Sequence, residues 1–208
     1  MTAADTYSDL LSLDRAVITT RDAAARIKTS TPEAIRRLRR MEEAGLVFHV
    51  RRGLWSLDPA LETFALAPFL TSPFPAYVSF WSALHRHGMI EQIPRLISVA
   101  SLDRPRRIKT AIGEFEVHQL KPEVFGGYEG SREEGLVATA EKALFDTIYV
   151  RCAAGGKAFF PELEIPEKFQ LKVVKMWTAR IESPRLRTLV KNRFEDVVGD
   201  PLPGPTPE

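Results

Sequence analysis

The chain has 208 residues, of which 44% are hydrophobic and 27% are charged, a composition typical of globular proteins that bury a core. This length suits one domain or two small ones, and the single cysteine, Cys152, excludes a disulfide framework and a cysteine-based zinc cage. The formal net charge of +2 says little about partners. Because no apolar run has the length of a membrane span, we expect a cytoplasmic protein.

Positive charge is concentrated near the N-terminus. Between Arg26 and Arg52 the chain holds eight Lys or Arg residues against three acids, so the remainder of the chain is mildly acidic. A basic segment joined to a mildly acidic one is typical of a nucleic-acid-binding protein whose second domain has another task.

Helical spacing of apolar residues predicts two short helices before residue 30. The first covers about residues 6–13, where four apolar positions recur: Tyr7, Leu10, Leu11 and Leu13. The second runs from about residue 21 to residue 28, with Thr19 or Thr20 as its N-cap. Its expected inward face has three apolar residues: Ala23, Ala24 and Ile27.

A third helix is predicted after the hydroxyl-rich turn of residues 29–31. Ser30 and Glu33 have the spacing of a capping box; alternatively, Thr31 is the cap and Pro32 takes the first helical position. The expected inward stripe repeats every three residues: Ile35, Leu38 and Met41.

Beyond Gly45, a suitable residue to end this helix, the pattern predicts strands at 46–50 and 54–57 joined by a turn at 51–53. Three helices followed by a two-stranded ribbon is the order of a winged helix-turn-helix. We therefore predict such a DNA-binding domain over residues 1–57, followed by a connecting helix and linker over residues 58–76.

The third helix and the ribbon turn carry the candidate DNA contacts. A major groove accepts one α-helix, and an arginine can donate two hydrogen bonds to guanine. Hydroxyls and exposed N–H groups at a helix start suit a phosphate. The predicted DNA-binding residues are Thr29, Ser30, Thr31, Glu33, Arg36, Arg37, Arg39, Arg40, Arg51 and Arg52. The alternative is a solvated helix face, against which four arginines in five positions without interleaved acids argue.

Residues 77–198 predict a mixed α/β domain with a small antiparallel sheet, so the fold class is α+β. The connecting helix is expected to start at Asp58 and to end at the prolines from Pro68 onward. A strand is expected at 96–102 and a hairpin at 106–112 and 114–120. Helices are expected at 79–87, 137–153, 166–181 and 184–198. The proline-rich segment 199–208 is expected to be disordered.

Titratable pairs in this second region do not have the spacing of a joint catalytic or metal site. His85 and His87 are two residues apart and point in different directions on a helix. Glu141 and Asp146 are separated by about 140° around a helix. Glu141 with Lys142, or Lys142 with Asp146 at four residues, suits a structural ion pair better. We expect neither an enzyme nor a bound metal or cofactor.

Three stretches in order resemble the AbiEi family, the antitoxins and autoregulators that accompany AbiEii-type nucleotidyltransferase toxins. They are ITTRDAAARIKTSTPEAIRRLRRMEEAGLVFHVRRGLWSL (18–57), YVSFWSALHRHGMIEQIP (77–94) and GLVATAEKALFDTIYV (135–150). The resemblance implies a repressor that binds inverted repeats upstream of its own operon, often as two copies bound cooperatively. It also implies a C-terminal domain that counters the toxin, by direct contact or without a stable complex.

Three lysines, Lys168, Lys172 and Lys175, are expected on one helix face. They form a solvated face, a contact to an acidic toxin surface, or extra contacts to DNA phosphates. Two other functions remain open: an antitoxin that acts through protein contacts with little DNA binding, and an unrelated winged-helix regulator.

Overall fold

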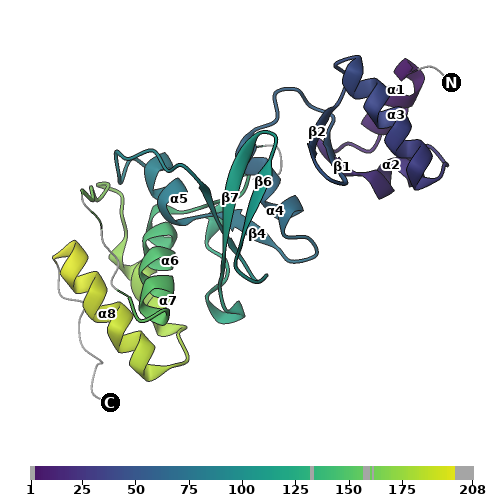
Figure 1. Ribbon diagram of the computed structural model, residues 1–208. Helices are drawn as coiled ribbons and strands as arrows, with labels where there is room; N and C mark the ends of the chain where they lie inside the picture. The colour runs from purple at the N-terminus through teal and green to yellow at the C-terminus, as the bar shows by residue number, and fades with distance from the viewer. Residues whose placement is uncertain (1–2, 132–133, 157–159, 161, 200–208) are drawn as a thin grey trace.

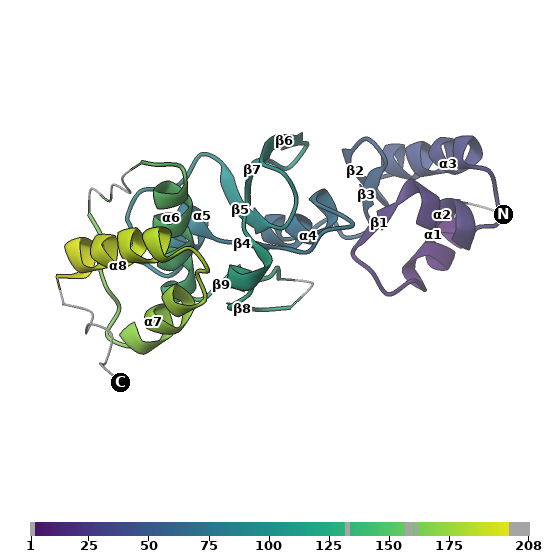
Figure 2. The ribbon, with the colours of Figure 1, turned by 90° about the horizontal axis from the view of Figure 1, so that it is seen from below.

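The computed structural model describes residues 3–131, 134–156, 160 and 162–199, and it has a mixed α+β fold with two sheets (Figure 1). The molecule is elongated. Residues 3–57, here called the head, lie at one end, and α7 (Leu171–Ala179) and α8 (Pro184–Val198) lie at the other (Figures 1 and 2). Residues 61–198 are called the body. Apart from Gly199, the tail predicted to be disordered lies outside the described residues.

Three helices of the head surround its hydrophobic core. They are α1 (Ala3–Leu11), α2 (Thr20–Arg26) and α3 (Thr31–Glu43). Leu10 is fully buried in this core, whereas Leu11 is 48% exposed. In α2 the predicted cap is confirmed, because the Thr19 hydroxyl accepts from the Asp22 N–H in a capping box. The predicted inward face of α2 is confirmed as well.

Ser30 is the N-cap of α3, so the alternative with Thr31 at the cap is wrong. The Ser30 hydroxyl accepts from the Glu33 N–H at 3.4 Å, and Pro32 is the second helical residue. The inward face consists of three residues: Ala34, Leu38 and Met41. Ile35 is only half-buried, because the stripe follows a period of 3.6 residues rather than three.

A three-stranded antiparallel sheet closes the head. The predicted ribbon is confirmed as β2 (Phe48–Arg51) and β3 (Leu54–Ser56). The sequence analysis missed β1 (Val17–Thr19), which pairs with β3 and places that strand in the middle. Strand β2 is irregular at Val50, between the pairs His49–Trp55 and Arg51–Leu54, as in a β-bulge.

The segment between the head and the large sheet contains less helix than predicted. Residues 58–62 are not helical, and the Asp58 carboxylate accepts from the Ala60 N–H at 2.8 Å, which favours a turn. A 3-10 turn, η1 (Thr63–Leu66), leads into α4 (Ala67–Leu70). Pro68 lies in the first turn of α4 rather than ending a helix, because a proline needs no partner there.

The body contains a six-stranded mixed sheet, not the small antiparallel sheet that was predicted. Its order is β6-β7-β5-β4-β9-β8, and the pairs β4–β9 and β5–β7 are parallel. The strands are β4 (Ala76–Val78), β5 (Ile97–Ser101), β6 (Arg106–Thr110), β7 (Gly113–Gln119), β8 (Tyr128–Glu129) and β9 (Val137–Ala138). Strands β5, β6 and β7 match the prediction; β4, β8 and β9 have two or three residues each and were missed.

Helices cover this sheet on both sides. Helix α4 lies on the side toward the head, and α5 (Phe80–Arg86), α6 (Ala140–Ala153), α7 and α8 lie on the opposite side (Figures 1 and 2). Helix α6 packs against α5, α7 and α8, so its side chains are buried around most of its circumference. It begins three residues later than predicted because 137–138 form β9, and α7 begins at Leu171 rather than after Pro166.

The head contacts the body through more than the connecting chain. Val50 and Leu54 of the head sheet pack in the hydrophobic cluster of the body. In addition, the N–H of Ala111, in the turn between β6 and β7, donates to the Val50 carbonyl at 2.9 Å. The bulged residue of β2 is therefore bonded to the body.

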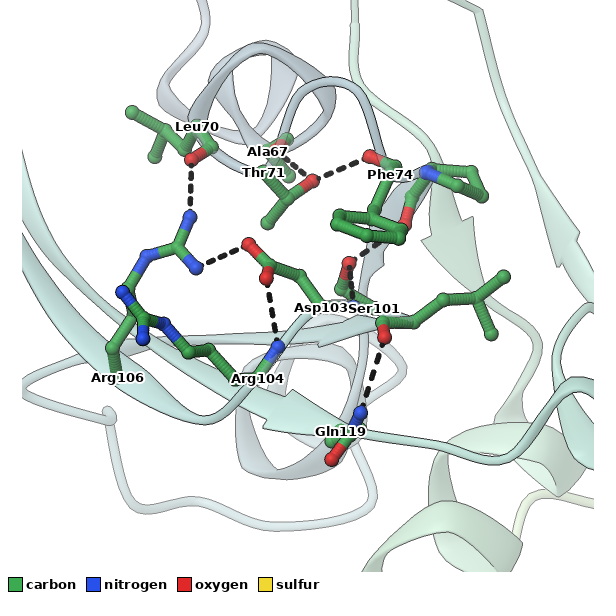
Figure 3. A network of polar contacts seen from close by, with 11 residues as sticks. Ala67, Leu70, Thr71, Phe74, Ser101, Asp103, Arg104, Arg106 and Gln119 are labelled. Carbon is green, nitrogen blue, oxygen red and sulfur yellow. Dashed lines mark hydrogen bonds and ion pairs between the residues drawn. The ribbon is translucent and has the colours of Figure 1, made fainter.

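A polar network joins α4 to the strands of the large sheet (Figure 3). The Arg106 guanidinium at the start of β6 donates to the Asp103 carboxylate and, at 3.1 Å, to the Leu70 carbonyl at the end of α4. The Asp103 N–H donates in turn to the Ser101 hydroxyl at 3.1 Å. This network fixes the short helix next to the connecting segment.

Candidate nucleic-acid interface

The outer face of α3 carries the arginines that the sequence singled out. Arg36, Arg39 and Arg40 are exposed, and Arg37 is half-buried at the side of the helix. Nε of Arg37 lies 3.2 Å from Oε1 of Glu33, and a nitrogen of Arg36 lies 3.2 Å from the other oxygen of the same carboxylate. Two of the four arginines are therefore paired with an acid of their own helix.

The pairing keeps the Glu33 carboxylate charged. The hydrogen bond from Arg37 lowers the pKa of Glu33; burial opposes this shift, and the charges of Arg36, Arg37 and Arg40 add to it. Within the part of the chain that the structure describes, Arg39 and Arg40 form no ion pair. These two arginines are the ones available on α3 for a negatively charged ligand.

A groove with a volume of about 860 Å³ runs between α3, the start of α2 and the ribbon β2–β3. Its lining includes three arginines, one from each element: Arg21, Arg39 and Arg52. Each is exposed, and none of them forms an ion pair in the described chain. The groove therefore concentrates positive charge at the junction of the helix and the ribbon.

Buried contacts beneath the groove fix the ribbon against α2. The Trp55 indole N–H donates to the Thr20 hydroxyl at 3.0 Å, and the Thr20 N–H donates to the Gly53 carbonyl at 3.0 Å. The His49 ring lies against Trp55 with ring centroids 4.6 Å apart. Gly53 has a φ of +81°, which a glycine adopts without strain at the tight ribbon turn.

The structure separates the predicted DNA-binding residues into groups. Thr31, Arg39 and Arg52 line the groove, together with the half-buried Ile35. The Ser30 hydroxyl serves the helix cap, and Arg51 is half-buried at the end of β2.

Several other groove residues, among them Arg21 and His49, were not predicted as DNA contacts. The signal that could have found Arg21 is its place in the first turn of α2, beside the Thr19 cap.

The three lysines proposed for a toxin contact do not share one helix. Lys172 and Lys175 are exposed on α7, whereas Lys168 is exposed in the turn before that helix begins. The prediction of a single helical face is therefore wrong for Lys168, because Gln170 marks the N-cap position of α7.

The predicted Lys142–Asp146 ion pair is confirmed, and it is completely buried. Asp146 also accepts hydrogen bonds from Tyr77 at 3.0 Å and from Ser79 at 2.7 Å, and the Lys142 ammonium lies 4.7 Å from the centre of the Trp177 ring. Burial raises the pKa of Asp146 and lowers the pKa of Lys142, and their mutual attraction opposes both shifts. This cluster has no access to solvent and so is a structural centre.

The cluster joins two of the stretches that carried the family resemblance. Tyr77 and Ser79 come from the stretch 77–94, and Lys142 and Asp146 come from the stretch 135–150. The two stretches meet again where Nε2 of His87 lies 2.7 Å from the Ala138 carbonyl oxygen. His85 bonds separately, with Nδ1 3.2 Å from the Ile90 carbonyl oxygen, so the two histidines have different partners.

Comparison with known proteins found no family model that matches the chain and no similar protein among those with curated functions. Among the described residues, no helix has both the length and the apolar character needed to span a bilayer. No group of three or more His, Cys, Asp or Glu side chains in that same part of the chain is arranged to hold a metal ion.

Proposed function

We propose that the protein is a DNA-binding repressor and antitoxin of a toxin–antitoxin operon, with residues 1–57 acting as a winged helix-turn-helix. The observation that carries the proposal is the basic groove, in which Arg21, Arg39 and Arg52 come from three elements and lack acidic partners in the described chain. A cationic channel beside an exposed helix suits a duplex, whose phosphates supply regularly spaced negative charge.

In this mechanism α3 enters the major groove and the ribbon follows the adjacent backbone. Arg39 and Arg40 are the candidates for base contacts, since a guanidinium can donate to both O6 and N7 of guanine. The partly exposed Ile35 offers an apolar contact for a thymine methyl group. Arg21 and Arg52 neutralise phosphates, which provides affinity without reading the sequence.

The antitoxin part rests on the resemblance of the three sequence stretches to the AbiEi family. It assigns the body the task of countering a nucleotidyltransferase toxin, and it assigns the DNA target to inverted repeats upstream of the operon. The proposal expects a nucleotidyltransferase gene beside this one, and co-expression with that gene tests this part. Growth rescue by the full chain supports the proposal, and unrelieved toxicity contradicts it.

DNA binding is tested by fluorescence anisotropy with a duplex from upstream of the coding sequence, at fixed salt. The double variant Arg39→Ala, Arg40→Ala should weaken binding by about 1–3 kcal/mol for each arginine that makes a paired base contact. Arg104→Ala, which removes an exposed arginine from a loop of the body, is the matched control and should bind normally. Equal affinity of the unchanged chain for the upstream duplex and for a scrambled one would contradict specific recognition.

The position of Glu33 favours a second candidate, an antitoxin that acts by protein contact with little DNA binding. Its carboxylate holds Arg36 and Arg37, which reduces the positive charge that α3 offers to a duplex. Co-purification with the neighbouring nucleotidyltransferase, without a shift of upstream DNA, selects this candidate.

A further inference from the structure

The body contains a cleft of about 450 Å³ that the proposed function does not use. It lies between α5, the loop before β5, strand β7 and the end of α6, away from the groove of the head. Small-molecule sites commonly have volumes of about 300–1,000 Å³ and combine apolar walls with a few polar groups. The volume and the mixed lining of this cleft fit that description.

Two arginines form the cationic part of the cleft lining. Arg95 precedes β5, and Arg151 lies in the last turn of α6; both are exposed, and neither forms an ion pair within the described residues. His118 of β7 lies beside the Glu116 carboxylate and the Phe80 ring. Burial lowers the pKa of His118, the charge of Glu116 opposes that shift, and the charge of Arg151 adds to it. A neutral imidazole can donate one hydrogen bond.

The single acid in the lining is already paired. Glu116 of β7 lies with Oε1 3.0 Å from Nε of Arg107, on the neighbouring strand, and with Oε2 3.5 Å from Nε2 of His118. Because Arg107 offsets the charge of Glu116, the two remaining arginines give the cleft a net positive character. An anion entering it would meet two guanidinium groups without an internal competitor.

Another part of the lining is apolar. It is formed by Phe80 and Trp81 of α5 together with Ile93 and Pro94, and the Ile93 side chain is 76% exposed. Phe80 has a φ of +55°, a left-handed backbone conformation that bulky residues rarely adopt. This conformation accompanies a contact of the Phe80 ring with His118, with ring centroids 4.4 Å apart.

We propose that this cleft binds a small organic anion, with a carboxylate or phosphate held between Arg95 and Arg151 and an apolar or planar body against Trp81 and Ile93. Guanidinium groups pair readily with both kinds of anion, and an exposed aliphatic side chain beside an aromatic ring suits a flat apolar body. The site is independent of DNA binding, because it contains no residue of the head.

Isothermal titration of the full chain with phenyl phosphate, benzoate, inorganic phosphate and phenol tests the proposal. Phenyl phosphate or benzoate should bind about tenfold more tightly than phosphate or phenol alone. Only the aromatic anions carry both a charged group for the arginines and a ring for the apolar side chains. Arg95→Gln and Arg151→Gln should each weaken that binding about tenfold by removing a charge-assisted hydrogen bond. Arg104→Gln, an exposed arginine outside the cleft, is the control.

The proposal is overturned if neither aromatic anion binds, or if the cleft variants bind them as well as the control does. It is also overturned if phosphate alone binds as tightly as phenyl phosphate does, because the apolar side chains of the cleft would then contribute nothing to the affinity. Thermal melting of each variant, expected to match the unchanged chain because both arginines are exposed, confirms that lost binding comes from the site rather than from unfolding.

Discussion

Glu33 holds two arginines at once: Oε1 lies 3.2 Å from Nε of Arg37, and Oε2 lies 3.2 Å from a nitrogen of Arg36. Both pairs lie on the surface of α3, where solvent and salt screen such contacts and they add little to stability. They are therefore weak enough to be exchanged for phosphates. The carboxylate acts as a counter-charge that any bound duplex would have to displace.

Replacing that carboxylate tests its effect on DNA binding. Glu33→Gln should strengthen binding to upstream DNA, because it frees Arg36 and Arg37 and removes a negative charge beside the duplex. The slope of log affinity against log salt should steepen by about 0.9 for each additional phosphate that the variant neutralises. Anisotropy titrations at several salt concentrations measure both effects.

Glu43→Gln is the matched control for this experiment. Glu43 is exposed at the other end of α3, and within the described residues it forms no ion pair. The control should change affinity less than Glu33→Gln does. If Glu33→Gln instead weakens binding, the carboxylate orients the arginines for DNA rather than withholding them.

The cap of α3 gives a prediction about stability. Ser30→Ala should lower the free energy of unfolding by about 1 kcal/mol, because it removes the hydroxyl that accepts from the Glu33 N–H. Thr31→Ala, one residue later, leaves that hydrogen bond in place and should have little effect. Urea unfolding measures both variants, and a larger loss for Thr31→Ala would show that the cap lies at Thr31.

The buried pair of the body should show strong coupling between its two residues. Lys142→Met leaves the Asp146 carboxylate buried without its counter-charge and should cost about 3–5 kcal/mol of unfolding free energy. Asp146→Asn leaves the ammonium buried in the same way. The double variant should lose clearly less than the two single losses combined, since no uncompensated charge remains. Additive losses in urea unfolding would contradict a buried ion pair.

His118 should make folding sensitive to acid. Its pKa in the folded protein is below the ordinary value of 6.5, so the unfolded chain binds the proton more readily. Stability from this residue is complete above pH 6.5 and is lost as the pH falls from there through the folded pKa. Glu116 opposes the shift, whereas burial and Arg151 cause it.

Urea unfolding at a series of pH values from 8 to about 5 checks this expectation. His118→Gln should lose less stability than the unchanged chain over that interval, because a neutral amide does not titrate. The other histidines remain in both proteins, so the difference between the two curves isolates His118. Parallel curves would show that His118 titrates alike in the folded and unfolded states.

The sequence predicted the head better than the body, for identifiable reasons. Local signals are strong in the head, where the hydroxyls of Thr19 and Ser30 cap helices and Gly45 lies just beyond the end of α3 with a φ of +70°. Strands of two or three residues, such as β1 and β9, are too short to show alternation. Their existence depends on partners far along the chain, which a local pattern does not contain.

The burial of the Lys142–Asp146 pair was the other feature that the local sequence pattern did not predict. The spacing of Lys142 and Asp146 predicted their pairing, but it gave no sign that α6 would be enclosed by α5, α7 and α8. The groove likewise depends on tertiary packing, because Arg21 joins Arg39 and Arg52 only when the ribbon folds against the start of α2.

The bond between Ala111 and the carbonyl of Val50 has a geometrical consequence for an assembly of two copies. A DNA-binding domain attached only by a flexible linker could adapt to many distances between two DNA sites. Here the turn of a hairpin in the large sheet is bonded to the strand that leads to Arg51 and Arg52. If the proposed repressor binds DNA as two copies, each copy would therefore present these arginines at a fixed place relative to its body. The permitted distance between two sequence repeats would then be dictated by how the bodies meet.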